Sequence, residues 1–486
     1  MDPRDLAPDD VILNHIFPNQ PHVSIGKIFV QTREKCVFKA SFPDTRKPRK
    51  LHKRPRKVRR IVRLEVAAGD EEATKFATVS AMQQIASIAI PELIPETFQI
   101  GVTNNAQGKR VLFSVTKFVK GKTLEKAWEQ MSDENRLSIV TDLVEALRKL
   151  HSIGIRDFLD RIRYFLVQNN LRRASGGAGE HVLGGVEVMG GPSTGYFGPE
   201  DGPSLLGAVA KRWELSGRPF HTMITTASGG IVVKSRYSDL GFAKVEKSYL
   251  EEWYREAVLC HNDLNPLNII VRRPRNSSSV PGSVPGSGPG FASASASFSD
   301  YGSDSSSDSD SGSDSDSDYG SDSDSDSAAT NETSDYKLSA IIDWELSGFY
   351  PPSYELSLQD TYLSGANRLF SFYSLLKTQM KNVVPRSPSQ VSLLQAMQLL
   401  FESRQRRLRQ GNNIPAIIRE RFLQRLQLRR DEDPYLGWVP NDDQAARRVL
   451  SLADVLNIER EVVAEREARR EAKEASRLQV GTGSES

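Results

Sequence analysis

The chain has 486 residues, of which 38% are hydrophobic and 26% are charged, and its formal net charge is +2. This length exceeds one ordinary domain, and the balance of residue types is that of a globular protein with some polar excess, which excludes a fully disordered or fibrous chain. The two cysteines, Cys36 and Cys260, cannot build a disulfide framework and show no Cys-x-x-Cys metal spacing. They indicate a reducing compartment and buried, inert thiols.

The N-terminal stretch MDPRDLAPDD carries acids where a secretory signal needs a basic and then an apolar run. No window reaches the roughly 18 apolar residues of a membrane span. We therefore expect no membrane association and a cytoplasmic location, with a nuclear location left open by a basic tract at 46–60.

Two tracts of low complexity interrupt the foldable sequence. Residues 276–335 begin with Ser, Pro and Gly and become nearly pure Ser and Asp, so they bury almost nothing and should be disordered. The tract RKPRKLHKRPRKVRR at 46–60 is as basic as the first is acidic. Three interpretations of this basic tract are open. It is a solvated loop, it is a nuclear-import signal or polyanion-binding patch, or it binds the acidic tract within the same molecule.

After an N-terminal extension at 1–19, the chain is rich in strand formers up to residue 118. Enrichment in β-branched and aromatic residues predicts a hairpin and two later strands. These strands are 24–32, 36–42, 57–66 and 110–119. An amphipathic helix at 69–86 lies between them, with an apolar stripe formed by Phe76, Val79, Met82 and Ile85. We expect a small lobe at 20–118, made of a sheet with one helix and a basic loop at 45–60.

From Asp133 the apolar residues recur at helical spacing, through Leu137, Val140, Val144 and Leu147. The remainder is predicted to be mainly helical, with strands only near 261–271 and 337–346. The fold class is therefore α+β: a β-rich lobe, a hinge and a larger helical lobe. The helical lobe comprises 119–275 and 336–455, and a charged helix and tail follow at 456–486.

The segment HNDLNPLNIIV at 261–271 places polar residues densely before a run of strand formers. Kinase catalytic loops have a His-x-Asp, an Asn five positions after that Asp, and a later Asp at the end of the next strand. Asp263, Asn268 and Asp343 have this spacing. Phosphoryl transfer needs a carboxylate that takes the acceptor's proton and oxygen ligands that hold Mg²⁺ on the nucleotide phosphates. The combined pattern is much rarer than an isolated His-x-Asp and predicts a kinase-like architecture.

The candidate catalytic residues are Asp263 and His261. For His261 we favour a structural role, in which it braces the loop by hydrogen bonds. Taken alone, a histidine at this place would more often be a hydrogen-bonded core residue than a catalyst.

The segments CHNDLNPLNIIV at 260–271 and AIIDWELSGFYPPSYEL at 340–356 resemble the aminoglycoside phosphotransferase and choline kinase-like superfamily, especially its uncharacterised fungal members. The resemblance extends from about residue 20 to about residue 365, with weaker support at 93–101, 119–128 and 190–198. It implies a bilobal protein kinase-like fold, ATP and Mg²⁺ as cofactors, and transfer of the γ-phosphate to a hydroxyl of a small molecule.

The resemblance implies roles position by position. Asp263 would be the catalytic base, and Asn268 and Asp343 would ligate Mg²⁺. Arg63 would bind the nucleotide phosphates where protein kinases use Lys. Lys39 is the rival candidate for that role, and a plain surface arginine is the simpler alternative.

The expected nucleotide cleft has two further parts. Strand alternation puts Ile61 and Arg63 on one face, where both can line the cleft. The main chain of the hinge would meet adenine, and this hinge comprises Thr116, Lys117, Phe118 and Val119.

Three departures argue against a protein kinase. Asp-Trp-Glu replaces Asp-Phe-Gly, Asn265 stands where protein kinases place a Lys, and no Ala-Pro-Glu follows Asp343. The resemblance therefore favours a small-molecule kinase.

Two parts of the usual nucleotide clamp are missing. The phosphate loop offers only Gly26, against loops with three glycines. The helix places Thr78 where a Glu partner for the strand cation is expected. Glu71 or Glu72 could substitute, although a favourable interaction with the helix dipole explains both acids more simply.

The acidic tract falls between a strand ending near Arg272 and another starting near Lys337, which in this fold form a hairpin beside the active site. Because the entropy cost of a loop grows slowly with its length, an insertion there need not disturb the pairing. Its Ser-Asp repeats predict an acid-directed serine kinase as a regulatory partner.

The acceptor is less well defined. The segment YLEEWYREA at 249–257 has the acids and aromatics of a site for cationic amino-alcohols or aminoglycosides, but a helix that packs its aromatic side chains against the lobe is the simpler interpretation. The Gly-rich segment 176–207 is either an acceptor-side loop or a surface excursion.

The leading prediction is a monomeric ATP- and Mg²⁺-dependent small-molecule O-phosphotransferase without a nucleic-acid partner. The alternative is a catalytically silent kinase-like scaffold that engages partners through its charged tracts. A third interpretation, an acidic chaperone-like or nucleic-acid-linked nuclear protein, rests on the charge tracts alone.

Overall fold

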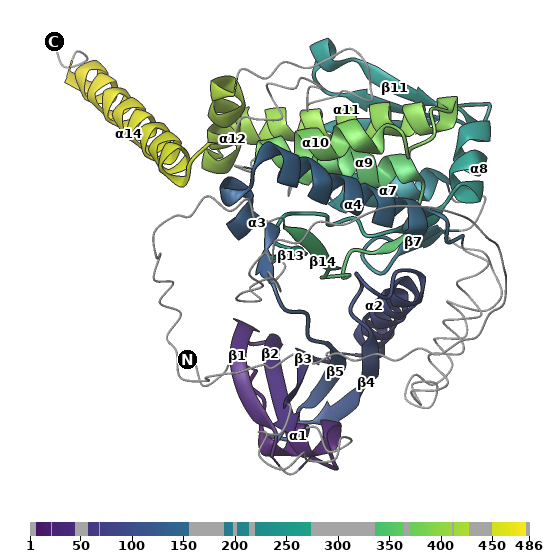
Figure 1. Cartoon of the computed structure of the whole chain (residues 1–486). Helices are drawn as coiled ribbons and strands as arrows, with labels where there is room; N and C mark the ends of the chain where they lie inside the picture. Colours follow the sequence, from purple (N-terminus) through teal and green to yellow (C-terminus); the bar gives the residue numbers. More distant parts are fainter. Residues whose placement is uncertain are drawn as a thin grey trace, which may run out of the picture. The chain divides into compact units, whose positions relative to one another are not determined.

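The chain folds into an N-terminal antiparallel sheet followed by a part made mostly of helices, a mixed α+β arrangement (Figure 1). The computed structural model describes residues 6–20, 22–43, 57–67, 69–154, 189–197, 202–212, 219–273, 336–363, 369–410, 413–426 and 450–482. The predicted acidic insertion at 276–335 and most of the basic tract at 46–60 lie outside the described residues.

The N-terminal sheet has five strands in the order β1-β2-β3-β5-β4, and all neighbouring strands are antiparallel. Their bounds are Ser24–Gln31 for β1, Lys35–Pro43 for β2, Lys57–Val66 for β3, Thr97–Asn104 for β4 and Arg110–Lys117 for β5. The predictions for β1, β2, β3 and β5 are confirmed. Strand β4 was not predicted, although Phe98, Ile100 and Val102 alternate with polar or small residues in its sequence TFQIGVTN and this period was an available signal.

One face of this sheet is a hydrophobic core that an N-terminal helix covers. Residues on this face have no solvent exposure, and they are Cys36, Phe38, Ala40, Val62 and Leu64. Helix α1 (Asp10–Ile16) adds Ile12, Leu13 and Ile16 to the same core. The predicted N-terminal extension thus contains a helix that packs on the sheet.

The opposite face of the sheet is half-buried and carries charge. The pairing of β2 with β3 sets Val37 opposite Arg63 and Lys39 opposite Ile61. Because side chains alternate along a strand, Ile61 and Arg63 share this face with Lys35 of β2. The predicted common face of Ile61 and Arg63 is confirmed.

Helix α2 (Asp70–Ala89) follows β3 and belongs to the core of the helical part. Met82 and Ile85 are buried in that core, as the apolar stripe predicts, and Val79 packs partly against it. Helix α2, which directly follows β3, therefore packs into the same hydrophobic core as the later helices.

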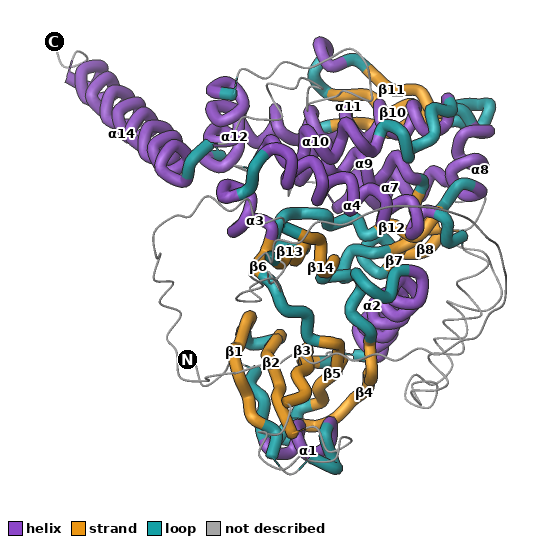
Figure 2. The backbone as a smooth tube through the Cα atoms, viewed as in Figure 1, coloured by secondary structure: helices purple, strands orange, loops and turns teal. Residues whose placement is uncertain are grey.

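The helical part is built on stacked helices (Figure 2). Their bounds are Leu124–Ala127 for α3, Asp133–His151 for α4, Gly202–Arg212 for α7, Lys247–Arg255 for α8, Pro352–Leu358 for α9, Phe370–Met380 for α10 and Pro388–Gln410 for α11. The N-cap of α4 is Ser132, whose Oγ accepts the Asn135 N–H at 3.3 Å.

The predicted apolar stripe of α4 is partly wrong. Val140, Val144 and Leu147 are buried, whereas Leu137 is 45% exposed. The buried stripe instead continues through Leu143 and Leu150. Leu137 precedes Val140 by about one turn and lies at the flank of this buried stripe.

Short strands also occur within the helical part and were not predicted. The first group is β9 (His221–Thr225), β10 (Ile231–Ser235) and β11 (Phe242–Val245), an antiparallel sheet. The second group is β7 (Met189–Gly191), β8 (Gly195–Phe197), β12 (Val258–Cys260) and β15 (Gly348–Tyr350). Most of these strands are too short to show a two-residue period, although the Gly-Gly turn between β9 and β10 is a hairpin signal.

Strands β13 (Ile269–Arg272) and β14 (Lys337–Ile341) pair antiparallel, with Arg272 opposite Lys337. The predicted hairpin on either side of the acidic tract is thus confirmed. Strand β6 (Lys122–Thr123) pairs with the other edge of β13. The chain approaches β13 so closely at Gly121 that an added Cβ would lie 2.5 Å from Ile270 Cγ2 and 2.6 Å from the Val271 carbonyl oxygen.

The C-terminal elements form a smaller cluster. Helices α12 (Ile414–Arg425) and α14 (Leu452–Thr482) bury Phe422 and Ile458 between them. Ion pairs join the helices, among them Arg421 with Glu465 at 2.9 Å and Arg425 with Glu461 at 2.6 Å. Within the described residues, no helix is both long and apolar enough to cross a membrane.

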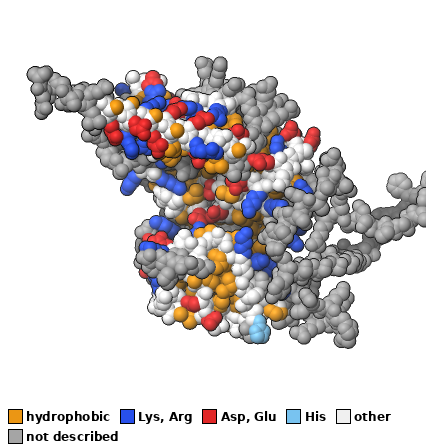
Figure 3. Space-filling view, turned by 90° about the vertical axis from the view of Figure 1, so that its left-hand side faces the viewer, with side chains coloured by type: hydrophobic (Ala, Val, Ile, Leu, Met, Phe, Trp, Pro, Cys, Tyr) orange, Lys and Arg blue, Asp and Glu red, His pale blue; other side chains and the backbone are white. Residues whose placement is uncertain are grey.

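The edge strand β1 exposes hydrophobic side chains. Ile25, Phe29 and Val30 are 41 to 47% exposed. Figure 3 shows a group of hydrophobic side chains in the lower half of the face that it draws. Lys27 lies over the Phe29 ring, 5.6 Å from its centroid, and a lysine on an edge strand discourages pairing with another chain.

Replacing Gly121 with Ala should lower the free energy of unfolding by about 1–3 kcal/mol, because the new methyl group overlaps β13. Gly154→Ala is the matched control, since an added Cβ there meets no heavy atom within 4 Å. Urea unfolding of both variants measures the difference. Equal stability of the two variants would contradict the close approach.

Candidate functional site

The polar segment His261 to Asn268 forms a loop between β12 and β13, and a buried carboxylate anchors it. Glu355 of α9 has no solvent exposure, and its Oε1 accepts the backbone N–H groups of His261 and Asn262, both at 2.9 Å. Its Oε2 lies 2.9 Å from His151 Nε2. Burial alone would raise the pKa of Glu355, but the hydrogen bond and charge of His151 and the loop N–H groups lower it. The anchor is therefore an ionised carboxylate.

His261 is fully buried, and its ring bonds only to the backbone among the described contacts. Its Nδ1 accepts the Asp263 N–H at 3.2 Å, and its Nε2 lies 3.0 Å from the Ile342 carbonyl oxygen. The Trp344 ring packs edge-on against it, with centroids 4.8 Å apart. Burial lowers the pKa of His261, which favours the neutral ring that these two bonds require. These contacts are consistent with the structural role predicted for His261, in which it holds the loop by hydrogen bonds.

The Asp263 carboxylate is held by two side-chain amides. Its Oδ1 accepts from Asn265 Nδ2 and its Oδ2 from Asn268 Nδ2, both at 2.9 Å. Asn268 Nδ2 also donates to the Asp263 carbonyl oxygen at 3.0 Å. Because Asn268 Nδ2 donates to Asp263, Asn268 Oδ1 is the side-chain atom that can coordinate a cation. The structure thus brings Asp263 and Asn268 into direct contact.

Asp343 follows β14 and is tied to the same loop. The Ile342 N–H donates to the Asn268 carbonyl oxygen at 2.9 Å, which extends the β13–β14 pairing toward Asp343. Asp343 has φ of 66° and Asn262 has φ of 63°, both in the left-handed region that non-glycine residues rarely adopt. Strained backbone of this kind concentrates at functional sites. The two residues belong to the two segments with kinase-like spacing.

The electrostatic setting of Asp343 is unusual for a carboxyl group at the surface. The side chain is exposed, yet the surrounding protein removes enough hydration to raise its pKa to about 6. Glu345 and Asp263 raise the pKa further, whereas Lys35 and Arg63 lower it. Three carboxyl groups thus converge beside two cations. Repulsion among carboxylates is a property of sites that take up a divalent cation.

Arg63 lies beside this group of carboxylates. Its Nε donates to Glu65 at 2.7 Å, and its NH2 lies 3.1 Å from Glu345. Lys35 also pairs with Glu345. The structure therefore brings Arg63 to the segment that bears Asp343 and Glu345.

Lys39, the rival candidate, lies elsewhere on the same sheet face. Its ammonium is 5.8 Å from the centroid of the Phe118 ring. Its Cε would be 2.6 Å from a Cβ added to Gly26, so the glycine leaves room for this side chain. Lys39 and Phe118 thus form a second cation-containing contact, next to the predicted hinge.

The four predicted hinge residues differ in whether their backbone groups are paired within the sheet. Thr116 and Lys117 lie within β5 between two neighbouring strands, and the Lys117 N–H donates to the Glu96 carbonyl oxygen at 2.9 Å. Phe118 and Val119 follow the end of the strand. Their main chain, rather than that of Thr116 and Lys117, lies outside the sheet pairing.

Helix α2 contributes an aromatic side chain that contacts Arg63. The Arg63 guanidinium lies 5.5 Å from the centroid of the Phe76 ring, and Thr78 Oγ1 donates to Thr74 of its own helix at 2.8 Å. The side chain of Glu71 lies outside the described residues. Glu72 is exposed, and among the described residues the carboxylate partners of Arg63 are Glu65 and Glu345.

Three functional candidates were missed from sequence: Glu355, Lys35 and Glu345. Glu355 lies 94 residues from His261, so local spacing carried no signal of their contact. Lys35 precedes the strand residues Val37 and Lys39 by the two-residue period, and this alternation was an available signal. Glu345 was noted only as a departure from Asp-Phe-Gly.

Potential metal-ligand atoms of His151, Cys260 and Glu355 lie within 4.8 Å of one another. Glu355 is already bonded to the loop and to His151. Burial raises the pKa of Cys260 well above its usual value, and a protonated thiol is a poor ligand. Burial also raises the pKa of Cys36 to about 11, so both cysteines are the inert thiols that their number predicts.

The other buried aromatics of the helical part serve packing. In α8, Leu250, Trp253 and Tyr254 are buried, and Trp253 Nε1 donates to the Ser389 carbonyl oxygen at 2.8 Å. The simpler interpretation of the segment 249–257, a packing helix, therefore describes these contacts. Much of the Gly-rich segment 176–207 lies outside the described residues.

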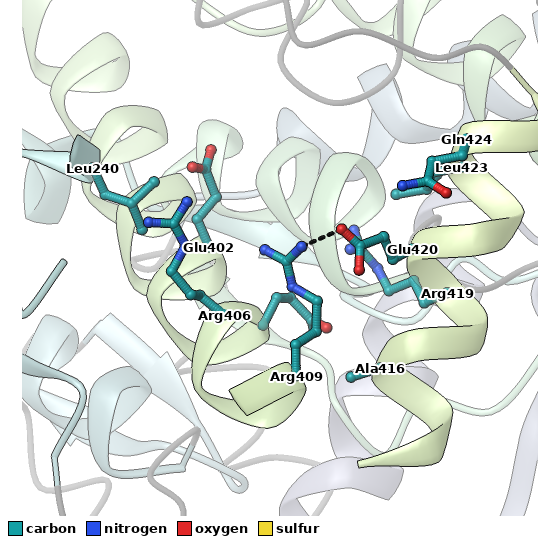
Figure 4. Close-up of a pocket in the computed structure, with 10 residues that line it drawn as sticks. Leu240, Glu402, Arg406, Arg409, Ala416, Arg419, Glu420, Leu423 and Gln424 are labelled. Atoms are coloured by element: carbon teal, nitrogen blue, oxygen red, sulfur yellow. Dashed lines mark hydrogen bonds and ion pairs between the residues drawn. The ribbon is translucent and has the colours of Figure 1, made fainter. Parts of the chain in front are cut away.

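A pocket of about 260 Å³ lies between α11 and α12 (Figure 4). It contains Arg406, Arg409 and Arg419, but no residue of the loop 261–268. Arg409 is paired with Glu420 (Figure 4), and Arg406 is paired with Asp239. Because acids already balance two of its cations, this pocket is a weaker candidate for a phosphate group than the polar loop.

No family model and no curated protein matches the chain. Among solved structures, the GDP complex of wild-type aminoglycoside 2'-phosphotransferase-IIIa is 12% identical, covers 93% of this chain and 97% of that chain, and has a TM-score of 0.33. A mutant of that enzyme with GDP is 12% identical, with 93% and 95% coverage and a TM-score of 0.31. The GDP and kanamycin complex of APH(2")-IIIa is 11% identical, with 93% and 97% coverage and a TM-score of 0.32. Superpositions this weak decide nothing about activity.

Replacing Glu355 with Gln should lower the free energy of unfolding by about 3–5 kcal/mol, because it removes the charge from a buried ion pair and offers the loop N–H groups a poorer acceptor. Glu145→Gln is the control, since Glu145 pairs with Arg148 at the surface and its replacement should cost less than about 1 kcal/mol. Urea unfolding at pH 7 measures both variants. A loss below 1 kcal/mol for Glu355→Gln would show that the anchor is dispensable.

Replacing Asp343 with Asn should stabilise the metal-free protein near pH 8, and this gain should shrink toward pH 4. The folded-state pKa of about 6 lies above the unfolded value of about 3.9, so the protonated form stabilises the fold at low pH and that stability is lost as pH rises through 6. Solvent screening limits the effect to about 1 kcal/mol. Urea unfolding in EDTA at both pH values tests this, and a gain independent of pH would contradict it.

Proposed function

We propose that the chain is an ATP- and Mg²⁺-dependent phosphotransferase with a bilobal protein kinase-like fold, which transfers the γ-phosphate to a hydroxyl of a small molecule. One observation carries the proposal: Asp263 bonds Asn268, and the backbone of Asn268 is tied to the segment that bears Asp343. These are the residues whose spacing predicts a catalytic loop and its partner carboxylate.

Asp263 is the proposed base. Two amides hold its carboxylate in one orientation, so little reorganisation is needed when the acceptor hydroxyl binds. The remaining lone pairs of its oxygens can accept the hydroxyl proton. His261 and Glu355 act through the loop backbone and are positioning residues.

The donor set fits a hard divalent cation. Asn268 Oδ1 and the Asp343 carboxylate would hold Mg²⁺. The pKa of Asp343 is raised first by loss of hydration and then by the neighbouring carboxyl groups of Glu345 and Asp263, whose repulsion a cation would relieve. Mg²⁺, when bound with nucleotide, supplies neutralisation of phosphate charge.

Two further groups suit the nucleotide. Arg63 is proposed to contact its phosphates, because it lies on the half-buried, charged face of the sheet beside the carboxyl group of Glu345. The main chain of Phe118 and Val119 is proposed to meet adenine, with Lys39 stacked nearby on the Phe118 ring.

A catalytically silent scaffold is the second candidate, and one observation favours it. The first hairpin offers only Gly26, and Lys39 fills the space above it, so no set of backbone amides in this segment is arranged as in a glycine-rich loop. In that case the charged tracts would engage partner proteins, and nucleotide would not stabilise the chain.

Mg·ATP at about a hundred times its dissociation constant should raise the free energy of unfolding by about 2.7 kcal/mol. The Asp343→Ala variant should lose the Mg²⁺-dependent part of this gain. Asp263→Asn should keep nucleotide binding and lose phosphate transfer to a panel of hydroxylated acceptors by at least a hundredfold. Thermal unfolding and transfer of labelled γ-phosphate measure the two effects.

Asp239→Asn is the control, because this exposed residue pairs with Arg406 at the distant pocket. It should change neither binding nor transfer. Wild-type protein that stays folded but gains no stability from Mg·ATP would favour the silent scaffold. Undiminished transfer by Asp263→Asn would remove Asp263 from the role of base.

A further inference from the structure

Two cations from one face of the N-terminal sheet converge on a single carboxylate beyond it. Lys35 of β2 pairs with Glu345, and the NH2 group of Arg63 of β3 lies 3.1 Å from the same carboxylate. Glu345 lies two residues after Asp343 in the chain. The three side chains are 29%, 21% and 37% exposed, so the cluster lies at the edge of solvent.

Strand register brings the two cations together. Lys35 is opposite Glu65, and Arg63 is opposite Val37, so Lys35 and Arg63 are diagonal neighbours on one face. A shift of one residue would instead place the apolar side chains Cys36 and Leu64 there. The convergence therefore follows from the pairing that also buries the core of the sheet.

Glu345 occupies the role that a helix carboxylate would otherwise have. Among the described side chains, Arg63 contacts Phe76 of α2, and its two carboxylate partners are Glu65 on its own strand and Glu345. Of these two, only Glu345 comes from the segment that bears Asp343.

We infer that Glu345 is a positioning residue that orients both Lys35 and Arg63 toward the nucleotide phosphates, and that Lys35 is a second phosphate-binding cation. This inference rests on the proposed function. Two side-chain cations beside Asp343 would supply positive charge that a glycine-rich loop provides elsewhere through its amides. A lysine and an arginine differ in hydrogen-bond geometry, so a shared carboxylate fixes both in one place.

The relative effects on nucleotide binding and on stability distinguish a positioning role of Glu345 from a purely structural one. Ion pairs this exposed contribute little to the stability of the fold, because water screens them and the long side chains lose entropy. Loss of Glu345 should therefore alter nucleotide binding far more than the unfolding midpoint. A merely structural ion pair would show the opposite pattern.

The experiment compares Mg·ATP binding by wild type, Glu345→Gln, Lys35→Gln and the double variant, using isothermal titration. We expect roughly tenfold weaker binding for each single variant, because a charge-assisted contact is misplaced or lost. The loss of affinity in the double variant should be smaller than the product of the two single losses, because Glu345 acts partly through Lys35 and partly through Arg63. Glu345→Asp keeps the charge and should recover part of the affinity.

Kinetics provide a readout that a structural role would not move. With Glu345→Gln, the KM for ATP should rise roughly tenfold and kcat should fall less, because Asp263 and its amide partners are intact. Asp70→Asn is the matched control, since Asp70 at the start of α2 is an exposed acid that pairs with Arg110 of β5 at 2.9 Å. Its KM should match wild type.

Each outcome decides between the two hypotheses. Wild type that binds no Mg·ATP overturns the proposed function and this inference with it. Wild type that binds, with unchanged or tighter binding by Glu345→Gln, overturns only the inference, since Glu345 would then be idle or would compete with phosphate. Full additivity of Lys35→Gln and Glu345→Gln overturns the action of Glu345 through Lys35.

Discussion

The carboxylate of Glu355 is the constraint on which the polar loop depends. A buried carboxylate without partners would cost many kcal/mol, and Glu355 avoids this cost by accepting two backbone N–H groups and contacting His151. The same bonds satisfy the amides of His261 and Asn262, which would otherwise be buried without acceptors. Anchor and loop therefore require each other, and the left-handed backbone of Asn262 persists because both hold it.

From this anchor the site is assembled by backbone pairing. The loop leads into β13, β13 pairs with β14, and the bond from Ile342 to Asn268 extends the pairing toward Asp343. His261 links the same two segments from behind, through the Ile342 carbonyl oxygen. Positions separated by some eighty residues in sequence are thus fixed relative to one another by hydrogen bonds, with side-chain packing around them.

Sequence predicted those parts of the fold in which a local pattern is strong. β-branched runs located β1, β2, β3 and β5, and helical spacing located α2 and α4, although Leu137 was wrongly assigned to the buried stripe. Short strands such as β11 carry too few residues for a period to emerge. The kinase-like spacing of the loop predicted Asp263 and Asn268 as members of one site, and the two side chains are in direct contact. Contacts of Glu355 and Glu345 depend on tertiary folding, and no local pattern encodes them.

The pairing of Arg272 with Lys337 has a consequence for the connectivity of the protein. The chain leaves β13 and enters β14 at directly opposite positions, so the hairpin is closed by its own ladder rather than by the residues between them. The intervening sequence is therefore a natural place to break the chain. Fragments ending at 273 and beginning at 336 share the ladder, the loop and the Glu355 anchor as their interface, which makes the molecule a candidate for reconstitution from two separately expressed halves.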